Sequence, residues 1–192
     1  MSKNKQSRLM NEHRAFDSYF KVDVGCIEEV SDGKVIETYD RYKLTRPDAV
    51  AILVFNEDSK KIILVKQFRY PIIHHTSENV LEVVAGKIDI GESPKQSAIR
   101  ELLEEIGYRV TEDKLGNAIE IFASPGYSTE KIYIFLAVVK DSDKDPNHGG
   151  GLETEHENIE LVEMDINEFM RQVKYNEIKD SKTIISANLI KI

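Results

Sequence analysis

The chain has 192 residues, of which 41% are hydrophobic and 31% are charged, and its formal net charge is −8. This length allows one domain, with or without a small appendage, and the acidic charge disfavours nonspecific binding to nucleic acid. A single cysteine, Cys26, excludes an intrachain disulfide, and no apolar run is long enough to span a membrane. We therefore expect a cytoplasmic globular protein.

The first 46 residues predict a tail and a small sheet. Residues 1–14 are polar and basic, so we expect a flexible N-terminus. Residues 19–29 alternate in polarity, residues 31–34 are typical of a turn, and residues 35–44 predict the returning strand. Residues 15–46 are thus expected to form an N-terminal antiparallel β subdomain. Such a hairpin is marginal alone, and we expect it to pair with a second subunit in a homodimer.

From residue 47 to residue 192 strands and helices are intermixed, which predicts an α/β domain with a mixed sheet flanked by helices. The predicted strands cover residues 49–55, 61–68, 81–85, 118–123, 131–139 and 159–164. Predicted helices cover residues 93–106, 166–175 and about 181–190.

The segment from Gly86 to Tyr108 is the most informative part of the chain. Ser93, Pro94 and Gln96 predict a helix start with a capping box, and Gly107 predicts its end. Ala98, Ile99, Leu102, Leu103 and Ile106 form an apolar stripe, and Glu101, Glu104 and Glu105 are expected on the opposite face. Three carboxylates this close repel one another, and a bound Mg²⁺ or Mn²⁺ would offset that repulsion.

The same segment resembles the Nudix box, Gly-x5-Glu-x7-Arg-Glu-U-x-Glu-Glu-x-Gly-U, where U is bulky and apolar. The matching positions are Gly86, Glu92, Arg100, Glu101, Glu104, Glu105 and Gly107, with Leu102 and Tyr108 in the apolar positions. The resemblance implies the Nudix α/β/α sandwich and cleavage of a nucleoside diphosphate linked to another group.

Three features outside the box are similar to the ADP-ribose pyrophosphatase and GDP-mannose hydrolase subgroup. They are the Ser-Pro-Gly turn at 124–126, the strands at 64–71 and 81–86, and the C-terminal segments at 149–160 and 178–183. Each alone has a plainer reading, as a turn, a surface strand end or a solvated loop. Their order around a complete box favours the functional reading.

The resemblance implies roles for the box residues. Glu101 and Glu105 would be metal ligands, with the backbone carbonyl of Ala85 as a third. Glu104 would share a metal or orient water. Glu92 would be mainly structural, pairing with Arg100, while Gly86 begins the box.

The resemblance also implies that the general base lies outside the box, within residues 153–157. Glu155 is the preferred base and Glu157 the preferred additional metal ligand, although the choice among Glu153, Glu155 and Glu157 stays open. Arg69 is expected to bind phosphate, because a guanidinium group can hold two oxygens. Glu82 is expected to bind the nucleobase or ribose, and Arg46 and Tyr127 to line the pocket.

The sequence therefore predicts a Mg²⁺-dependent hydrolase of a nucleoside diphosphate sugar, of the ADP-ribose or GDP-mannose type, with Mn²⁺ as a possible substitute. The products would be a nucleoside monophosphate and a sugar phosphate. The alternative is a Nudix module that senses ADP-ribose without cutting it. The complete set of carboxylates argues against that alternative, and so does the lack of a basic DNA-binding segment.

Overall fold

The computed structural model describes residues 5–152, 154 and 158–190, and the chain divides into two compact units. The first unit contains residues 1–48 and 122–131, and the second contains residues 49–121 and 132–192. Within the described residues no helix is long and apolar enough to cross a membrane.

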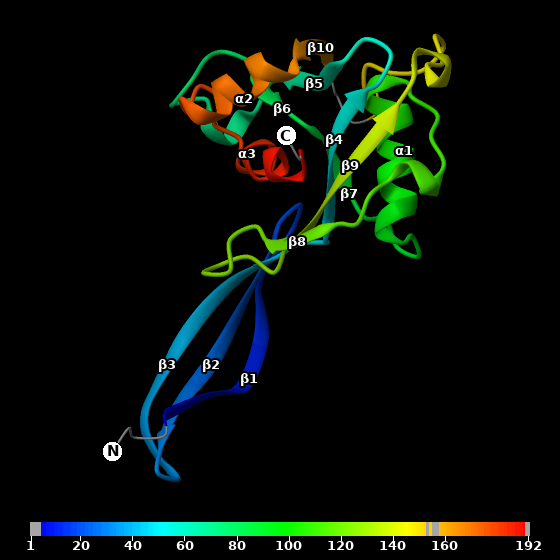
Figure 1. Cartoon of the computed structure of the whole chain (residues 1–192). Helices are drawn as coiled ribbons and strands as arrows, with labels where there is room; N and C mark the ends of the chain where they lie inside the picture. Colours follow the sequence, from blue (N-terminus) through cyan, green and yellow to red (C-terminus); the bar gives the residue numbers. More distant parts are fainter. Residues whose placement is uncertain (1–4, 153, 155–157, 191–192) are drawn as a thin grey trace. The chain divides into compact units, whose positions relative to one another are not determined.

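The first unit is built on a three-stranded antiparallel sheet in the order β1-β2-β3 (Figure 1). Its strands are β1 (Lys5–Asp17), β2 (Lys21–Ser31) and β3 (Lys34–Thr45). The hairpin of β2 and β3 confirms the expected antiparallel subdomain. Asp23 of β2 is buried and pairs with the side chains of Arg14 and Thr45, so one carboxylate links all three strands.

Residues 5–14 differ from the expected flexible tail, because they form most of β1. All thirteen residues of this strand are exposed, so no burial pattern in the sequence identifies it. Backbone pairing with β2 holds the strand, with register shifts between Leu9 and Asn11 and between Arg14 and Phe16.

The second unit has a mixed sheet in the order β10-β5-β4-β9-β8, with β6 paired to β5 and β7 paired to β4. β4 runs parallel to β9 and antiparallel to β5 and β7. The strands are β4 (Ala49–Asn56), β5 (Lys61–Gln67), β6 (Val80–Glu82), β7 (Val84–Lys87), β8 (Ile119–Phe122), β9 (Lys131–Val139) and β10 (Glu160–Asp165). All six predicted strands of this region are confirmed within a few residues, the one expected at 81–85 as the short pair β6 and β7.

Helices cover both faces of this sheet, and residues of β4 show why. Val50, Ile52 and Val54 pack on the side of α1 (Pro94–Ile106), whereas Ala51 and Leu53 pack on the side of α2 (Ile166–Lys174) and α3 (Ser181–Ser186). Alternate side chains of a strand point to opposite faces, so the apolar residues of β4 contribute to the hydrophobic cores on both faces of the sheet. The predicted α/β/α arrangement is thus confirmed. Short 3-10 helices occupy Tyr70–Ile72, Glu112–Lys114, Asp141–Asp143 and Ala187–Leu189.

After β9 the chain passes the end of α1, and Asp145 fixes this segment. Its carboxylate accepts hydrogen bonds from the backbone N–H of Asn147 (2.9 Å) and from Nε of Arg109 (2.7 Å). These two donors lower the pKa of Asp145 to about 2, from an ordinary value of 3.8. The ionised carboxylate is therefore favoured in the folded state.

We expect Asp145→Asn to reduce stability at pH 7 and to matter less in acid. A carboxyl whose pKa is lower in the folded state stabilises the fold above its unfolded pKa and loses that effect as the pH falls. The stability difference between wild type and variant should shrink as the pH falls between about pH 4 and pH 2. Urea unfolding of both proteins at pH 7 and pH 3 measures it, and a difference independent of pH would contradict this account.

Candidate active site

α1 begins and ends as the sequence predicts. Ser93 Oγ accepts a hydrogen bond from the Gln96 backbone N–H (3.3 Å), and the Gln96 side chain accepts one from the Ser93 N–H (2.8 Å). Gly107 ends the helix with φ of 70°, in the left-handed region that glycine tolerates best. Both ends of the carboxylate-bearing helix are therefore set by local sequence.

The faces of α1 differ from the prediction in one respect that matters for the site. Glu101 and Glu105 are buried, at 9% and 2% exposure, beside Ala98, Leu102 and Ile106, and only Glu104 of the three carboxylates is half-buried. The expectation that all three lie opposite the apolar stripe is wrong. Residues four apart form a row of their own, and the row of Glu101 and Glu105 meets β7, where Glu105 Oε2 accepts a hydrogen bond from the Ala85 N–H (3.3 Å).

Gly86 is required by how closely the Glu101 carboxylate approaches the backbone of β7. A Cβ atom added at Gly86 would fall on the carboxylate group of Glu101. Gly86 itself is held in β7 by pairing with Val50 of β4. The glycine that opens the box therefore provides the space in which one predicted metal ligand lies.

Arg100 pairs with three carboxylates of the box. Its guanidinium group contacts Glu92 (3.1 Å), Glu101 (2.7 Å) and Glu104 (3.1 Å), and Glu92 also accepts a hydrogen bond from Ser97 Oγ (2.6 Å). Burial alone would lower the pKa of Arg100, but the hydrogen bonds and charges of these glutamates raise it. The same pairing acts in the opposite direction on the carboxylate, because the hydrogen bonds from Arg100 and Ser97 lower the pKa of Glu92. Glu92 thus joins the loop to the helix.

The donors around α1 suit a hard divalent cation. Glu101, Glu104, Glu105 and the Ala85 carbonyl supply only oxygen atoms, which Mg²⁺ prefers. Within the described residues no three acidic, histidine or cysteine side chains already surround a common point. The Arg100 guanidinium group forms ion pairs with Glu101 and Glu104. The residues fit a metal in donor type and charge.

Arg69 and Glu82, both predicted to bind substrate, contact each other. Arg69 donates from Nε (2.9 Å) and from Nη2 (2.7 Å) to the two carboxylate oxygens of Glu82, which is 3% exposed. Burial lowers the pKa of Arg69, yet the bond to Glu82 and the charges of Glu82 and Glu105 raise it overall. The pair therefore lies within electrostatic reach of the Glu105 carboxylate of α1.

Sequence reasoning missed the role of α3 in this pair. Lys182 Nζ lies 3.6 Å from Glu82 and 2.6 Å from Asp180, and Asp180 accepts hydrogen bonds from the N–H and hydroxyl of Thr183. Thr183 Oγ1 in turn accepts a hydrogen bond from the Val83 N–H (2.9 Å), between β6 and β7. The sequence signals were the resemblance of residues 178–183 to the subgroup and an Asp-Ser-Lys-Thr helix start about a hundred positions after Glu82, and neither indicated a contact with Glu82.

We expect Arg69→Met to destabilise the protein by about 1–3 kcal/mol, because it leaves the buried Glu82 carboxylate with Lys182 alone. The effect is placed below that of a fully buried pair because the Arg69 side chain is 37% exposed. Urea unfolding measures it. The matched control is Arg171→Met, whose pairs with Glu168 and Glu177 are exposed to solvent, so its loss of stability should be clearly smaller than that of Arg69→Met. Equal losses in the two variants would contradict the role given to burial.

The other two predicted substrate residues lie in the first unit. Arg46 donates from Nε to Glu130 (3.3 Å), and its guanidinium carbon lies 5.6 Å from the centre of the Phe20 ring. Tyr127 is exposed and follows the Ser-Pro-Gly turn, and its carbonyl accepts a hydrogen bond from the Leu44 N–H (2.6 Å). Glu155 and Glu157, the predicted base and additional ligand, lie outside the described residues.

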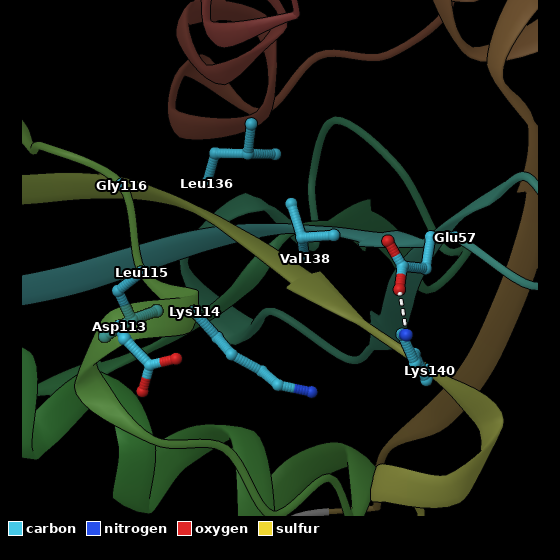
Figure 2. A pocket seen from close by; sticks show the side chains of 8 residues that line it. All are labelled: Glu57, Asp113, Lys114, Leu115, Gly116, Leu136, Val138 and Lys140. Carbon is cyan, nitrogen blue, oxygen red and sulfur yellow. Dashed lines mark ion pairs between the residues drawn. The ribbon is translucent and has the colours of Figure 1, made fainter.

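A cavity of about 400 Å³ in the second unit is lined by none of the predicted site residues. Figure 2 shows its lining, in which Lys140 pairs with Glu57 at 2.9 Å. The lining residues are Glu57, Asp113, Lys114, Leu115, Gly116, Leu136, Val138 and Lys140. Its two lysines face acidic neighbours, and Lys114 pairs with Asp143. We assign it no part in the site around α1.

Comparison with known proteins gives consistent matches. A family model described as "NUDIX domain" matches residues 45–184. "GDP-mannose pyrophosphatase" of Escherichia coli O1:K1 / APEC is 31% identical over 190 residues, covering 97% of this chain and 96% of that protein. The protein of the same name from Cronobacter sakazakii (strain ATCC BAA-894) is 33% identical over 156 residues, covering 80% and 78%.

A solved structure described as "Crystal structure of ADP compounds hydrolase" is similar with a TM-score of 0.74. The match covers 96% of this chain and 91% of that chain, at 23% sequence identity. At this identity the likeness shows the fold.

Proposed function

Because the chain belongs to the NUDIX domain family and is a Nudix hydrolase, we propose that it hydrolyses the pyrophosphate bond of a nucleoside diphosphate sugar. The preferred substrates are GDP-mannose and, second, ADP-ribose. The observation that supports this most is the similarity to GDP-mannose pyrophosphatases over 97% of this chain and 96% of the relative. Similarity of that extent includes both units and the segments outside the box.

A divalent cation, with Mg²⁺ preferred and Mn²⁺ as a substitute, would neutralise the charge that develops on the phosphoryl oxygens. We propose that Glu101, Glu105 and the Ala85 carbonyl hold it, with Glu104 beside them and Glu157 as an additional ligand. The support is the oxygen donor set on α1 and β7 and the burial of Glu101 and Glu105.

The remaining steps fall to side chains of the chain itself. We propose that Glu155 takes a proton from the attacking water while the new P–O bond forms and the bridging P–O bond breaks. Arg69 would orient the substrate by hydrogen bonds to phosphate oxygens, and Glu82 would fix Arg69 or contact the nucleoside. Arg46 and Tyr127 are proposed as lining residues. Glu92 and Arg100 would hold the loop and helix in register.

The first unit is proposed as the dimerisation element. Its sheet exposes large apolar side chains on the two outer strands, β1 and β3, among them Leu9, Met10, Phe16, Val35, Ile36 and Tyr42. A three-stranded sheet with so much exposed apolar surface would gain by burying it against a second copy. Sedimentation equilibrium should give twice the chain mass of 22.0 kDa, and a single-chain mass at micromolar concentration would contradict the proposal.

The proposed reaction is tested by incubating the purified chain with GDP-mannose and ADP-ribose, with Mg²⁺ or with EDTA. Chromatography should find GMP and mannose 1-phosphate from the first, or AMP and ribose 5-phosphate from the second, only when Mg²⁺ is present. Turnover of neither compound in the presence of Mg²⁺ would contradict the proposal. Turnover that continues in EDTA would contradict the proposed metal.

A further inference from the structure

The carbonyl groups at the end of α1 are all bound by one later segment of the chain. The last four carbonyls of a helix have no partner within the helix. Here the Gly151 N–H donates to Glu104 O (3.1 Å), the Gly150 N–H to Glu105 O (2.8 Å) and the Asp145 N–H to Gly107 O (2.7 Å). Lys144 Nζ donates to Ile106 O, which completes the run from 104 to 107. We call residues 144–151 the anchor segment.

Glycines make this close approach possible on both sides. Gly149, Gly150 and Gly151 have φ of 109°, 96° and 84°, a region in which other residues are strained. A Cβ at Gly107 would fall against the His148 carbonyl, and one at Gly149 would lie 3.1 Å from Gly107 N. The anchor segment and the helix end therefore touch backbone to backbone.

Lys144 is the one charged side chain in this set of donors. Its ammonium group lies 4.9 Å from the centre of the Tyr108 ring and points to the negative end of the helix dipole. Burial lowers its pKa. Ile159 also contacts the anchor segment, because its N–H donates to Gly150 O (3.2 Å).

Two of the bound carbonyls belong to Glu104 and Glu105 themselves, whose carboxylates are proposed for the metal site. We infer that Lys144 and the turn Gly149–Gly151 are positioning elements of the reaction, which fix the last turn of α1 and so the carboxylates it carries. The expected effect on turnover rests on the proposed function. The expected effect on ion binding rests on the proposed metal site. A displacement of reacting groups by about 1 Å can cost a hundredfold in rate.

The test compares Lys144→Met, which keeps the apolar stem but loses the ammonium group, with wild type. We expect kcat to fall about tenfold with KM within about twofold, as for other residues that orient metal ligands. Independently of turnover, Mn²⁺ titration followed by electron paramagnetic resonance should give a dissociation constant raised about threefold or more. Lys144→Arg, which can restore the donor and the charge, should recover most of both losses.

The matched control is Lys140→Met, a lysine nearby in sequence that pairs with Glu57 and not with α1. It should leave kcat and Mn²⁺ affinity unchanged. If Lys144→Met lowers only the melting temperature, with kcat and Mn²⁺ affinity as in wild type, the inference is overturned. Should Lys144→Met not fold, Lys144→Gln decides in the same way, with smaller losses expected and unchanged values overturning the inference. If wild type cleaves no nucleotide sugar, the proposed function fails, while the Mn²⁺ measurements still decide the role of Lys144.

Discussion

Replacing Glu105 with glutamine is expected to lower kcat for the nucleotide sugar by at least about a hundredfold, which corresponds to about 2.7 kcal/mol in the transition state. Glu105 is 2% exposed and faces β7, and its carboxylate accepts a hydrogen bond from the Ala85 N–H. Glutamine has the same shape and keeps an oxygen for that hydrogen bond, so the fold should persist. The negative charge proposed to hold the cation is lost.

Steady-state kinetics at saturating Mg²⁺ measure this effect, and circular dichroism confirms folding. The control is Glu112→Gln, the same change at an exposed residue in the short helix after α1. It should leave kcat within about twofold of wild type, as expected for a surface substitution. A folded Glu105→Gln variant that keeps more than a tenth of wild-type kcat would remove Glu105 from the proposed metal site.

Replacing Gly86 with alanine is expected to have the second-largest effect on activity, about tenfold to a hundredfold in kcat. The added methyl group would occupy the position of the Glu101 carboxylate, which must then move off β7. The clash is with the end of the Glu101 side chain, and moving a side-chain end costs less stability than moving backbone. The loss should therefore appear in activity and in Mn²⁺ affinity more than in melting temperature.

Gly116→Ala provides the matched control for this change. A Cβ at Gly116 meets only the Leu136 carbonyl, at an ordinary 3.6 Å, so both measurements should stay near wild type. If Gly86→Ala binds Mn²⁺ as tightly as wild type, Glu101 either is no ligand or tolerates displacement. Either result would contradict the role proposed for the close approach of Glu101 to Gly86.

Features fixed by local chemistry could be predicted from the sequence. Ser93 and Gln96 determine the start of α1 by contacts three residues apart, and Gly107 determines its end by its own backbone. Strands β4, β5 and β9 of the second unit could be predicted because their apolar runs are buried. β1 could not be predicted, because none of its residues is buried and only its pairing with β2 defines it.

The site itself could be predicted in residue type but not in arrangement. The spacing of Glu101 and Glu105 places them in one row, but whether that row meets solvent or β7 depends on how α1 docks. The pairing of Arg69 with Glu82 joins residues 13 positions apart, and Lys182 reaches Glu82 across a hundred positions. Contacts of that range depend on the folded sheet, and no short pattern in the chain encodes them.

The hydrogen bond from the Val83 N–H to Thr183 Oγ1 has a consequence for synthesis on the ribosome. A nascent chain that has emerged only as far as Asp180 already contains the whole box and strands β1 to β10, yet it lacks the hydroxyl and ammonium groups that α3 brings to Val83 and Glu82. Its Glu82 carboxylate would have Arg69 alone. These two contacts of the proposed substrate site can therefore form only after Thr183 has left the ribosome, and premature termination just before α3 would give a protein with its box intact but without them.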